Sequence, residues 1–109
     1  MPIYNKLVRD HIPDMIRLSG KGYQAEELSD EKYKEEAQKK LQEELNEYLS
    51  AETDEEALNE LADILELLHA LSNQHGASPE KLEEIRKEKA RVRGGFDEKR
   101  FLVMVEDKK

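Results

Sequence analysis

The sequence predicts an all-α domain built around an antiparallel pair of long helices. Apolar residues recur at helical spacing over two segments, residues 30–50 and 54–73, and a residue type that caps helices precedes each segment. The connector between the segments is short, so the two helices should pack side by side as a helical hairpin. Shorter helices and extended terminal segments are expected to flank this pair.

The residues before the first long helix indicate a short helix between two irregular stretches. Residues 3–8 are mixed in character, which is typical of a strand or an extended arm. Pro13 suits the first turn of a helix and Gly20 suits a helix end. We therefore expect a short helix over residues 11–18 and a connector over residues 21–28.

Each of the longer helices begins at a recognisable cap. Ser29 or Asp30 can cap the first of them. Residues 53–56 read Thr-Asp-Glu-Glu, which is a capping box, and they open the second. The Ser-Pro pair at 78–79 starts another helix, which should reach about residue 92 before the Gly-Gly pair at 94–95 breaks it.

The apolar pattern also predicts how the helices are covered. The second long helix carries Leu67, Ala70 and Leu71 beyond its main apolar stripe, so it should be buried on more than one side. A second copy of the chain would supply the cover and form a four-helix core across a two-fold axis. The apolar run 101–105 is typical of a terminal strand, and the N-terminal arm is its candidate pairing partner. No linker divides the chain, so residues 1–109 form one predicted domain.

Composition limits the classes of partner. The formal charge is −8, with 40% charged and 37% hydrophobic residues, so a nucleic acid polymer is not expected as a partner. Because there is no cysteine, disulfides and thiolate metal sites are excluded. No apolar run approaches the roughly 18 residues of a membrane span, and the first residues lack the apolar region of a signal peptide. We expect a cytoplasmic protein without a membrane partner.

Two similar acidic hexads are the main functional signal. Residues 44–49 read Glu-Leu-Asn-Glu-Tyr-Leu, and residues 60–65 read Glu-Leu-Ala-Asp-Ile-Leu. At about 100° per residue, the acids of both hexads fall at the same angles on the flank of an apolar stripe. If the helices pack side by side, Glu44, Glu47, Glu60 and Asp63 meet at one seam.

A bound divalent cation usually relieves the repulsion between carboxylates gathered in this way, and Mg²⁺ and Mn²⁺ prefer oxygen ligands. The alternative is that the four acids are solvated residues of a glutamate-rich chain, paired with lysines one turn away. Most of them lack such a lysine; Lys40, four residues before Glu44, is the exception. From the pattern alone, metal binding and the solvated alternative both stay open.

Three segments together resemble a known family. Residues 43–63 read Glu-Glu-x-x-Glu, then twelve residues, then Glu-x-x-Asp. This is similar to the acidic signature of the MazG-like all-α nucleotide pyrophosphohydrolases. Residues 4–13, Tyr-Asn-Lys-Leu-Val-Arg-Asp-x-Ile-Pro, and residues 89–96, Lys-x-x-x-Arg-Gly-Gly-Phe, resemble the two ends of a subgroup described as phosphoribosyl-ATP pyrophosphohydrolase-like. The resemblance covers nearly the whole chain.

The resemblance implies hydrolysis of a nucleoside triphosphate, or a related nucleotide, to the monophosphate and pyrophosphate. It also implies Mg²⁺, with Mn²⁺ as the alternative ion, and a homodimer or homotetramer built from helix pairs. Carried over to this chain, Glu44, Glu47, Glu60 and Asp63 would be metal ligands, and Glu43 would orient or deprotonate the attacking water. Attack at the α-phosphorus is expected by the same analogy.

Four basic residues are candidates for substrate binding. Lys6 and Arg9 lie in the N-terminal motif, and Lys89 and Arg93 lie one helical turn apart before the glycine pair. Guanidinium and ammonium groups suit phosphate oxygens. The alternative for Lys89 and Arg93 is that they complement the C-terminus of their helix.

Three functions remain open from the sequence. The first is a housecleaning nucleotide pyrophosphohydrolase, which removes non-standard or surplus nucleotides. The second is the hydrolase of phosphoribosyl-ATP in histidine biosynthesis. The third is a non-catalytic helical interaction module whose acids bind a cation structurally.

Overall fold

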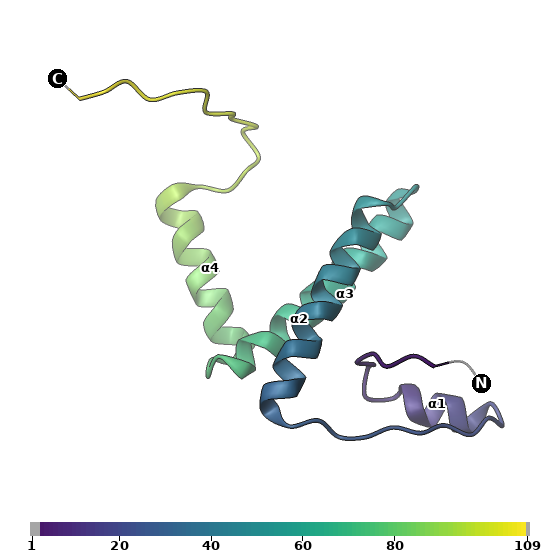
Figure 1. The fold of residues 1–109 in the computed structure, drawn as a ribbon. Coiled ribbons are helices and arrows are strands. Elements are labelled where there is room, and N and C mark those ends of the chain that lie inside the picture. Colours follow the sequence, from purple (N-terminus) through teal and green to yellow (C-terminus); the bar gives the residue numbers. More distant parts are fainter. Residues whose placement is uncertain (1–2, 109) are drawn as a thin grey trace.

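A computed structural model describes residues 3–108. These residues form four helices and no strand: α1 (Ile12–Leu18), α2 (Asp30–Leu49), α3 (Asp54–Gln74) and α4 (Pro79–Arg93). α2 and α3 lie against each other along their lengths as an antiparallel hairpin, α4 packs against α3 only, and α1 packs against no other helix of the described chain (Figure 1). The predicted all-α class and the antiparallel pair are confirmed.

The helix starts follow the predicted caps. Thr53 Oγ1 accepts a hydrogen bond from the backbone N–H of Glu56 at 3.1 Å, and the Glu56 carboxylate accepts one from the N–H of Glu52 at 3.0 Å. The reciprocal bond of the capping box therefore reaches one residue further back than the usual pattern. The hydroxyls of Ser29 and Ser78 cap α2 and α4 in the same way. Of these bonds, the two made by Thr53 and Glu56 hold the end of the short connector between α2 and α3.

The terminal segments correct one prediction. Residues 3–8 and 101–105 are irregular in the structure, and they form neither a strand nor a pair with each other. The C-terminal segment runs away from the helices, far from the N-terminal arm (Figure 1). An isolated apolar run has no neighbour to complete its backbone hydrogen bonds within one chain, so β-propensity alone does not make it a strand.

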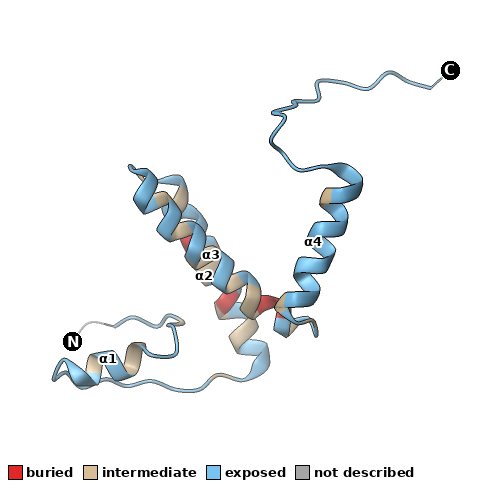
Figure 2. Ribbon diagram, turned by 180° about the vertical axis from the view of Figure 1, so that it is seen from behind, coloured by how far each residue is buried: buried red, intermediate tan, exposed pale blue. Residues whose placement is uncertain are grey.

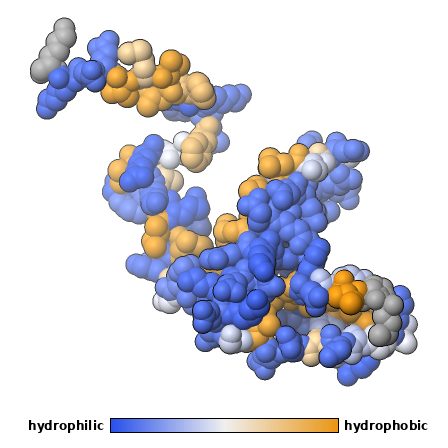
Figure 3. All heavy atoms as spheres, in the orientation of Figure 1, coloured by the Kyte–Doolittle hydropathy of each residue, from blue (hydrophilic) through white to orange (hydrophobic). Residues whose placement is uncertain are grey.

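The single chain buries little apolar surface. Within the described residues only Ala37 and Leu71 are buried hydrophobic residues, and Figure 2 shows the buried positions on α2 and α3. The radius of gyration is 18.9 Å, against about 13 Å for a compact domain of this length. Figure 3 shows apolar atoms on the outside of the chain, over the helices and the C-terminal segment. The chain on its own is therefore extended and thinly packed.

A row of leucines on the hairpin is exposed. We call it the leucine surface, and its members are 38–72% exposed: Leu45, Leu49, Leu58, Leu61, Leu65 and Leu68. The sequence placed the acids at the border of the apolar stripe, but Glu44 is only 6% exposed and is more buried than any of these leucines. The hairpin thus closes partly over its acids, and its leucine surface faces outward. None of the described helices is long and apolar enough to cross a membrane.

Candidate active site

The acidic hexads meet where α2 and α3 pack, as the sequence predicted. Two groups of carboxylates have oxygen atoms within 4.8 Å of one another: Glu43, Glu44 and Glu47 along α2, and Glu44 with Glu60 and Asp63 across the hairpin. Glu44 belongs to both groups and is the centre of the cluster. The same hexad on two antiparallel helices produces this arrangement, because each contributes acids one turn apart on the facing side.

Burial and like charge act on Glu44 together. Its pKa rises from 4.5 to about 8, first because burial penalises the charged form, and then because of the Glu60 side chain and the charges of Glu47 and Asp63. One carboxylate oxygen of Glu44 and one of Glu60 are buried without a hydrogen-bond partner. Unpartnered buried oxygens are uncommon in folded proteins, and a bound ion or an ordered water would satisfy them.

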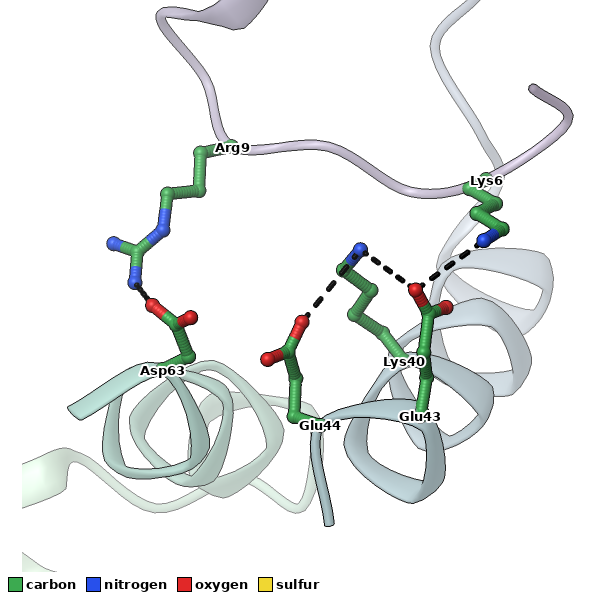
Figure 4. A network of polar contacts seen from close by, with 6 residues as sticks. All are labelled: Lys6, Arg9, Lys40, Glu43, Glu44 and Asp63. Atoms are coloured by element: carbon green, nitrogen blue, oxygen red, sulfur yellow. Dashed lines mark hydrogen bonds and ion pairs between the residues drawn. The ribbon is translucent and has the colours of Figure 1, made fainter. Parts of the chain in front are cut away.

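Three cations surround the cluster (Figure 4). Arg9 donates to Asp63 Oδ1 at 2.6 Å and Lys6 donates to Glu43 Oε1 at 3.2 Å, both from the N-terminal arm. Lys40, on α2, has its Nζ 3.7 Å from both Glu43 Oε1 and Glu44 Oε1. Lys6, with help from Lys40, holds the pKa of Glu43 below its usual value. Glu43 and Glu44 are adjacent in sequence, yet their environments push their pKa values in opposite directions.

Two of these three cations are residues that the sequence predicts for substrate binding, and the third is not. Lys6 and Arg9 were predicted to bind substrate, and the structure places both on the predicted acids, 37 and 54 residues away in sequence. Lys40 lies one helical turn before Glu44 in the sequence. Its spacing of three and four residues from Glu43 and Glu44 was the signal, because both spacings face the same side of a helix.

The other two basic candidates lie elsewhere in the chain. Lys89 and Arg93 are exposed on the far part of α4, and no ion pair joins either to an acid of the cluster within the described residues. α4 diverges from the hairpin in both views of the chain (Figures 1 and 2). Their predicted contact with substrate needs either a second chain or a movement of α4, and it stays a prediction.

The donor set fits a hard divalent cation. All donors are carboxylate oxygens, which is the chemistry that Mg²⁺ and Mn²⁺ select. The two unpartnered buried oxygens belong to this donor set and are compatible with a bound cation. Glu44, Glu60 and Asp63 would hold it across the hairpin, and Glu47, which is exposed, would complete the set from the rim.

A helical hairpin with this acidic cluster defines the class of MazG-like all-α nucleotide pyrophosphohydrolases. A family model described as phosphoribosyl-ATP pyrophosphohydrolase matches residues 7–90, which is well over half of the chain and includes every acid of the cluster. The chain therefore belongs to the phosphoribosyl-ATP pyrophosphohydrolase family. Comparisons with curated proteins and with solved structures give no significant match.

Proposed function

We propose that this enzyme hydrolyses phosphoribosyl-ATP to phosphoribosyl-AMP and pyrophosphate, with Mg²⁺ held by Glu44, Glu47, Glu60 and Asp63. The main support is the carboxylate cluster, with its two unpartnered buried oxygens, which lies inside the segment that the family model matches. From the sequence, housecleaning of nucleoside triphosphates is the first expectation. The family match favours its alternative, the hydrolysis of phosphoribosyl-ATP.

Glu43 is the proposed base. Its pKa is below the usual value, so it is ionised at neutral pH but only weakly basic. Its side chain is 32% exposed, so water can reach it. Bound Mg²⁺ would neutralise phosphate charge and make water a better nucleophile. Glu43 would take the proton of the water that attacks the α-phosphorus. The bond from that phosphorus to the bridging oxygen breaks, and pyrophosphate leaves with the bonding electrons.

Lys6 and Arg9 have two roles in this proposal. In the metal-free chain they neutralise Glu43 and Asp63. A cation held by Asp63 would compete with Arg9 for the charge of this carboxylate and would weaken the ion pair. The guanidinium then lies beside the site on a short arm, where it suits the oxygens of an incoming phosphate.

Self-association is part of the proposal. The leucine surface is uncovered and the chain buries only two apolar residues fully in its described part, which is too little core for a stable lone domain of this size. A four-helix core across a homodimer would cover it and could bring Lys89 and Arg93 of one chain to the acids of the other. Leu61→Lys should shift the protein to a smaller species in light scattering; an unchanged mass would remove the leucine surface from the interface.

The test of the reaction is pyrophosphate release from a panel of nucleotides that includes phosphoribosyl-ATP, with Mg²⁺, Mn²⁺ or EDTA. The wild type is compared with Glu47→Gln, in the cluster, and Glu66→Gln, exposed on the same hairpin and outside both acidic groups. We expect metal-dependent release from phosphoribosyl-ATP that Glu47→Gln reduces by about 100-fold or more and Glu66→Gln leaves unchanged.

Other outcomes would select another function. Preferential release from a modified nucleoside triphosphate would restore the housecleaning prediction. No release from any nucleotide by a folded, metal-binding oligomer would favour the non-catalytic interaction module. The cytoplasmic location expected from the sequence belongs to the proposal as well; fractionation of expressing cells tests it.

A further inference from the structure

The apolar run at residues 101–105 is uncovered within the chain. Its members are 70–90% exposed: Phe101, Leu102, Val103, Met104 and Val105. Among the described residues, those at 100–108 make no backbone–backbone hydrogen bond, and Figure 3 shows apolar atoms on the segment that leaves α4. We call residues 98–108 the tail. Its apolar side chains and its backbone groups both lack a partner within the described chain.

A turn after α4 directs the tail away from the helices. The backbone N–H of Lys99 donates to the carbonyl oxygen of Phe96 at 3.2 Å, and Lys99 has a φ of 59°. This left-handed residue ends the turn, so an extended strand can begin at Arg100. The apolar run that follows has no glycine or proline and contains two β-branched residues and one aromatic residue, a composition that favours strands. A strand with a free edge is a template for pairing with another chain.

The charges on the two sides of the run mirror each other with opposite sign. The residues before it are Glu98, Lys99 and Arg100, and the residues after it are Glu106, Asp107 and Lys108. If two tails pair antiparallel about a two-fold axis at Val103, each residue faces the one that lies equally far on the other side of Val103. The charged pairs are then all of opposite sign: Arg100 with Glu106, Lys99 with Asp107, and Glu98 with Lys108.

Other arrangements of two tails bring like charges together. A slip by one residue places Glu98 opposite Asp107 in one direction and Lys99 opposite Lys108 in the other. A parallel pair in register places every charge opposite its own copy. Because like charges directly opposite each other are destabilising, the sequence selects the antiparallel register centred on Val103. The tail carries equal numbers of acidic and basic residues, so it has no net charge to attract a polyanion or an anionic surface.

We propose that the tail is an interaction surface for a second copy of this chain, in which residues 100–106 of the two chains pair as antiparallel strands centred on Val103. Phe101 of each chain then faces Val105 of the other, an aromatic and β-branched pair of the kind that stabilises sheets. The paired backbones complete the hydrogen bonds that the single chain leaves open. This contact goes beyond the proposed reaction and involves no residue of the acidic cluster.

The strength of this contact depends on how the chains are held together. A ribbon of two strands is marginally stable on its own in water. The leucine surface, which we propose to join chains through the hairpin, would raise the local concentration of tails to about the millimolar range. The tail contact therefore rests on the proposed self-association for its stability, whereas its register rests on the charges of the tail.

Cysteine cross-linking tests the register, because the chain has no cysteine of its own. In the proposed pair, Val103 faces its own copy with Cα atoms about 4.5–5.5 Å apart, which a disulfide can span. Leu102 is the matched control, because it faces Met104 and its own copy lies diagonally at about 7–8 Å. In a glutathione redox buffer, Val103→Cys should form a covalent dimer about tenfold faster than Leu102→Cys.

Charge exchange in the Val103→Cys background tests the partner. Adding Arg100→Glu or Glu106→Arg places like charges opposite each other in both symmetry-related pairs, and each should slow cross-linking about three- to tenfold. A mixture of the two variants has opposite charges in both pairs of the heterodimer, which should form at the rate of Val103→Cys alone. Arg100→Glu also breaks an exposed ion pair with Glu98, 2.7 Å long, which the mixture does not restore. Rescue in the mixture therefore reports contact between chains.

The outcomes separate this contact from the proposed reaction. Equal rates for the two cysteine variants, or no slowing by either charge change, would overturn the centred register. Slowing without rescue in the mixture would overturn the second copy as the occupant of the tail. Pyrophosphate release by the same variants, kept reduced, tests the reaction separately, because the tail lies outside the acidic cluster. The expected cross-linking without pyrophosphate release would keep the contact and refute the reaction, and pyrophosphate release with equal cross-linking rates would do the opposite.

Discussion

Neutralising Glu44 should stabilise the metal-free protein, although the residue lies at the centre of the site. Its pKa is 4.5 when unperturbed and about 8 in the folded chain. Between these values the folded state holds a proton that the unfolded state has lost, so the free energy of unfolding falls as pH rises, by up to about 1.4 kcal/mol per pH unit. The penalty is absent below pH 4.5 and complete above pH 8.

The magnitude at pH 7 follows from the same two values. At pH 7, which is 2.5 units above the unperturbed pKa of 4.5, Glu44 is still mostly protonated in the folded chain. Holding this proton lowers the free energy of unfolding by about 3 kcal/mol. Glu44→Gln removes this penalty and keeps the shape of the side chain. We expect the variant to be more stable than the wild type by about 2–3 kcal/mol at pH 7 and to have a nearly flat pH dependence.

The assay is urea unfolding in EDTA at a fixed chain concentration, because self-association makes stability depend on concentration. Wild type, Glu44→Gln and Glu66→Gln are compared at pH 5, 7 and 8. Glu66→Gln, exposed and outside both acidic groups, should follow the wild type. If Glu44→Gln is less stable than the wild type at pH 8, or keeps the wild-type slope with pH, the reasoning on the buried carboxylate is wrong.

Three further outcomes follow from the site and the caps. Mg²⁺ binding at pH 7 should release about 0.9 proton per chain, because a group of pKa about 8 is mostly protonated there; calorimetry in two buffers of different ionisation enthalpy measures this, and Glu44→Gln should abolish it. Arg9→Gln should tighten Mg²⁺ binding about two- to fivefold by freeing Asp63, whereas Arg17→Gln, whose partner is on its own helix, should not. Thr53→Ala should lower the free energy of unfolding by about 1 kcal/mol without changing the affinity for Mg²⁺; a stability equal to that of the wild type would show that the capping bond contributes nothing.

The helices could be read from the sequence because their start signals are local. The serine and threonine caps act on backbone groups three residues away, so spacing alone locates them. The meeting of the acids also followed from pattern, because the acids of the repeated hexad fall at the same angles on the two helices of the antiparallel pair.

The cations around the acids could not be placed by the same means. Arg9 reaches Asp63 across 54 residues, and no periodicity reports a contact between an irregular arm and a helix. The terminal strand failed for a related reason, since a strand depends on a partner, and residues 101–105 have none among the described residues. The sequence also placed Glu44 at the rim of the core, because a helical wheel ranks residues by apolarity and does not show how deep the packing puts them.

The short connector of the hairpin sets an order of folding. Only four residues separate α2 from α3, so closing this hairpin needs little loop entropy and involves contacts close in sequence. The carboxylates of the cluster come together in the same step, before the distant arm can bring Lys6 and Arg9 to them. In the metal-free chain, the carboxylates of the cluster therefore repel one another while the hairpin closes. Low pH or Mg²⁺ should speed refolding because each reduces this repulsion, whereas a more stable N-terminal arm should not.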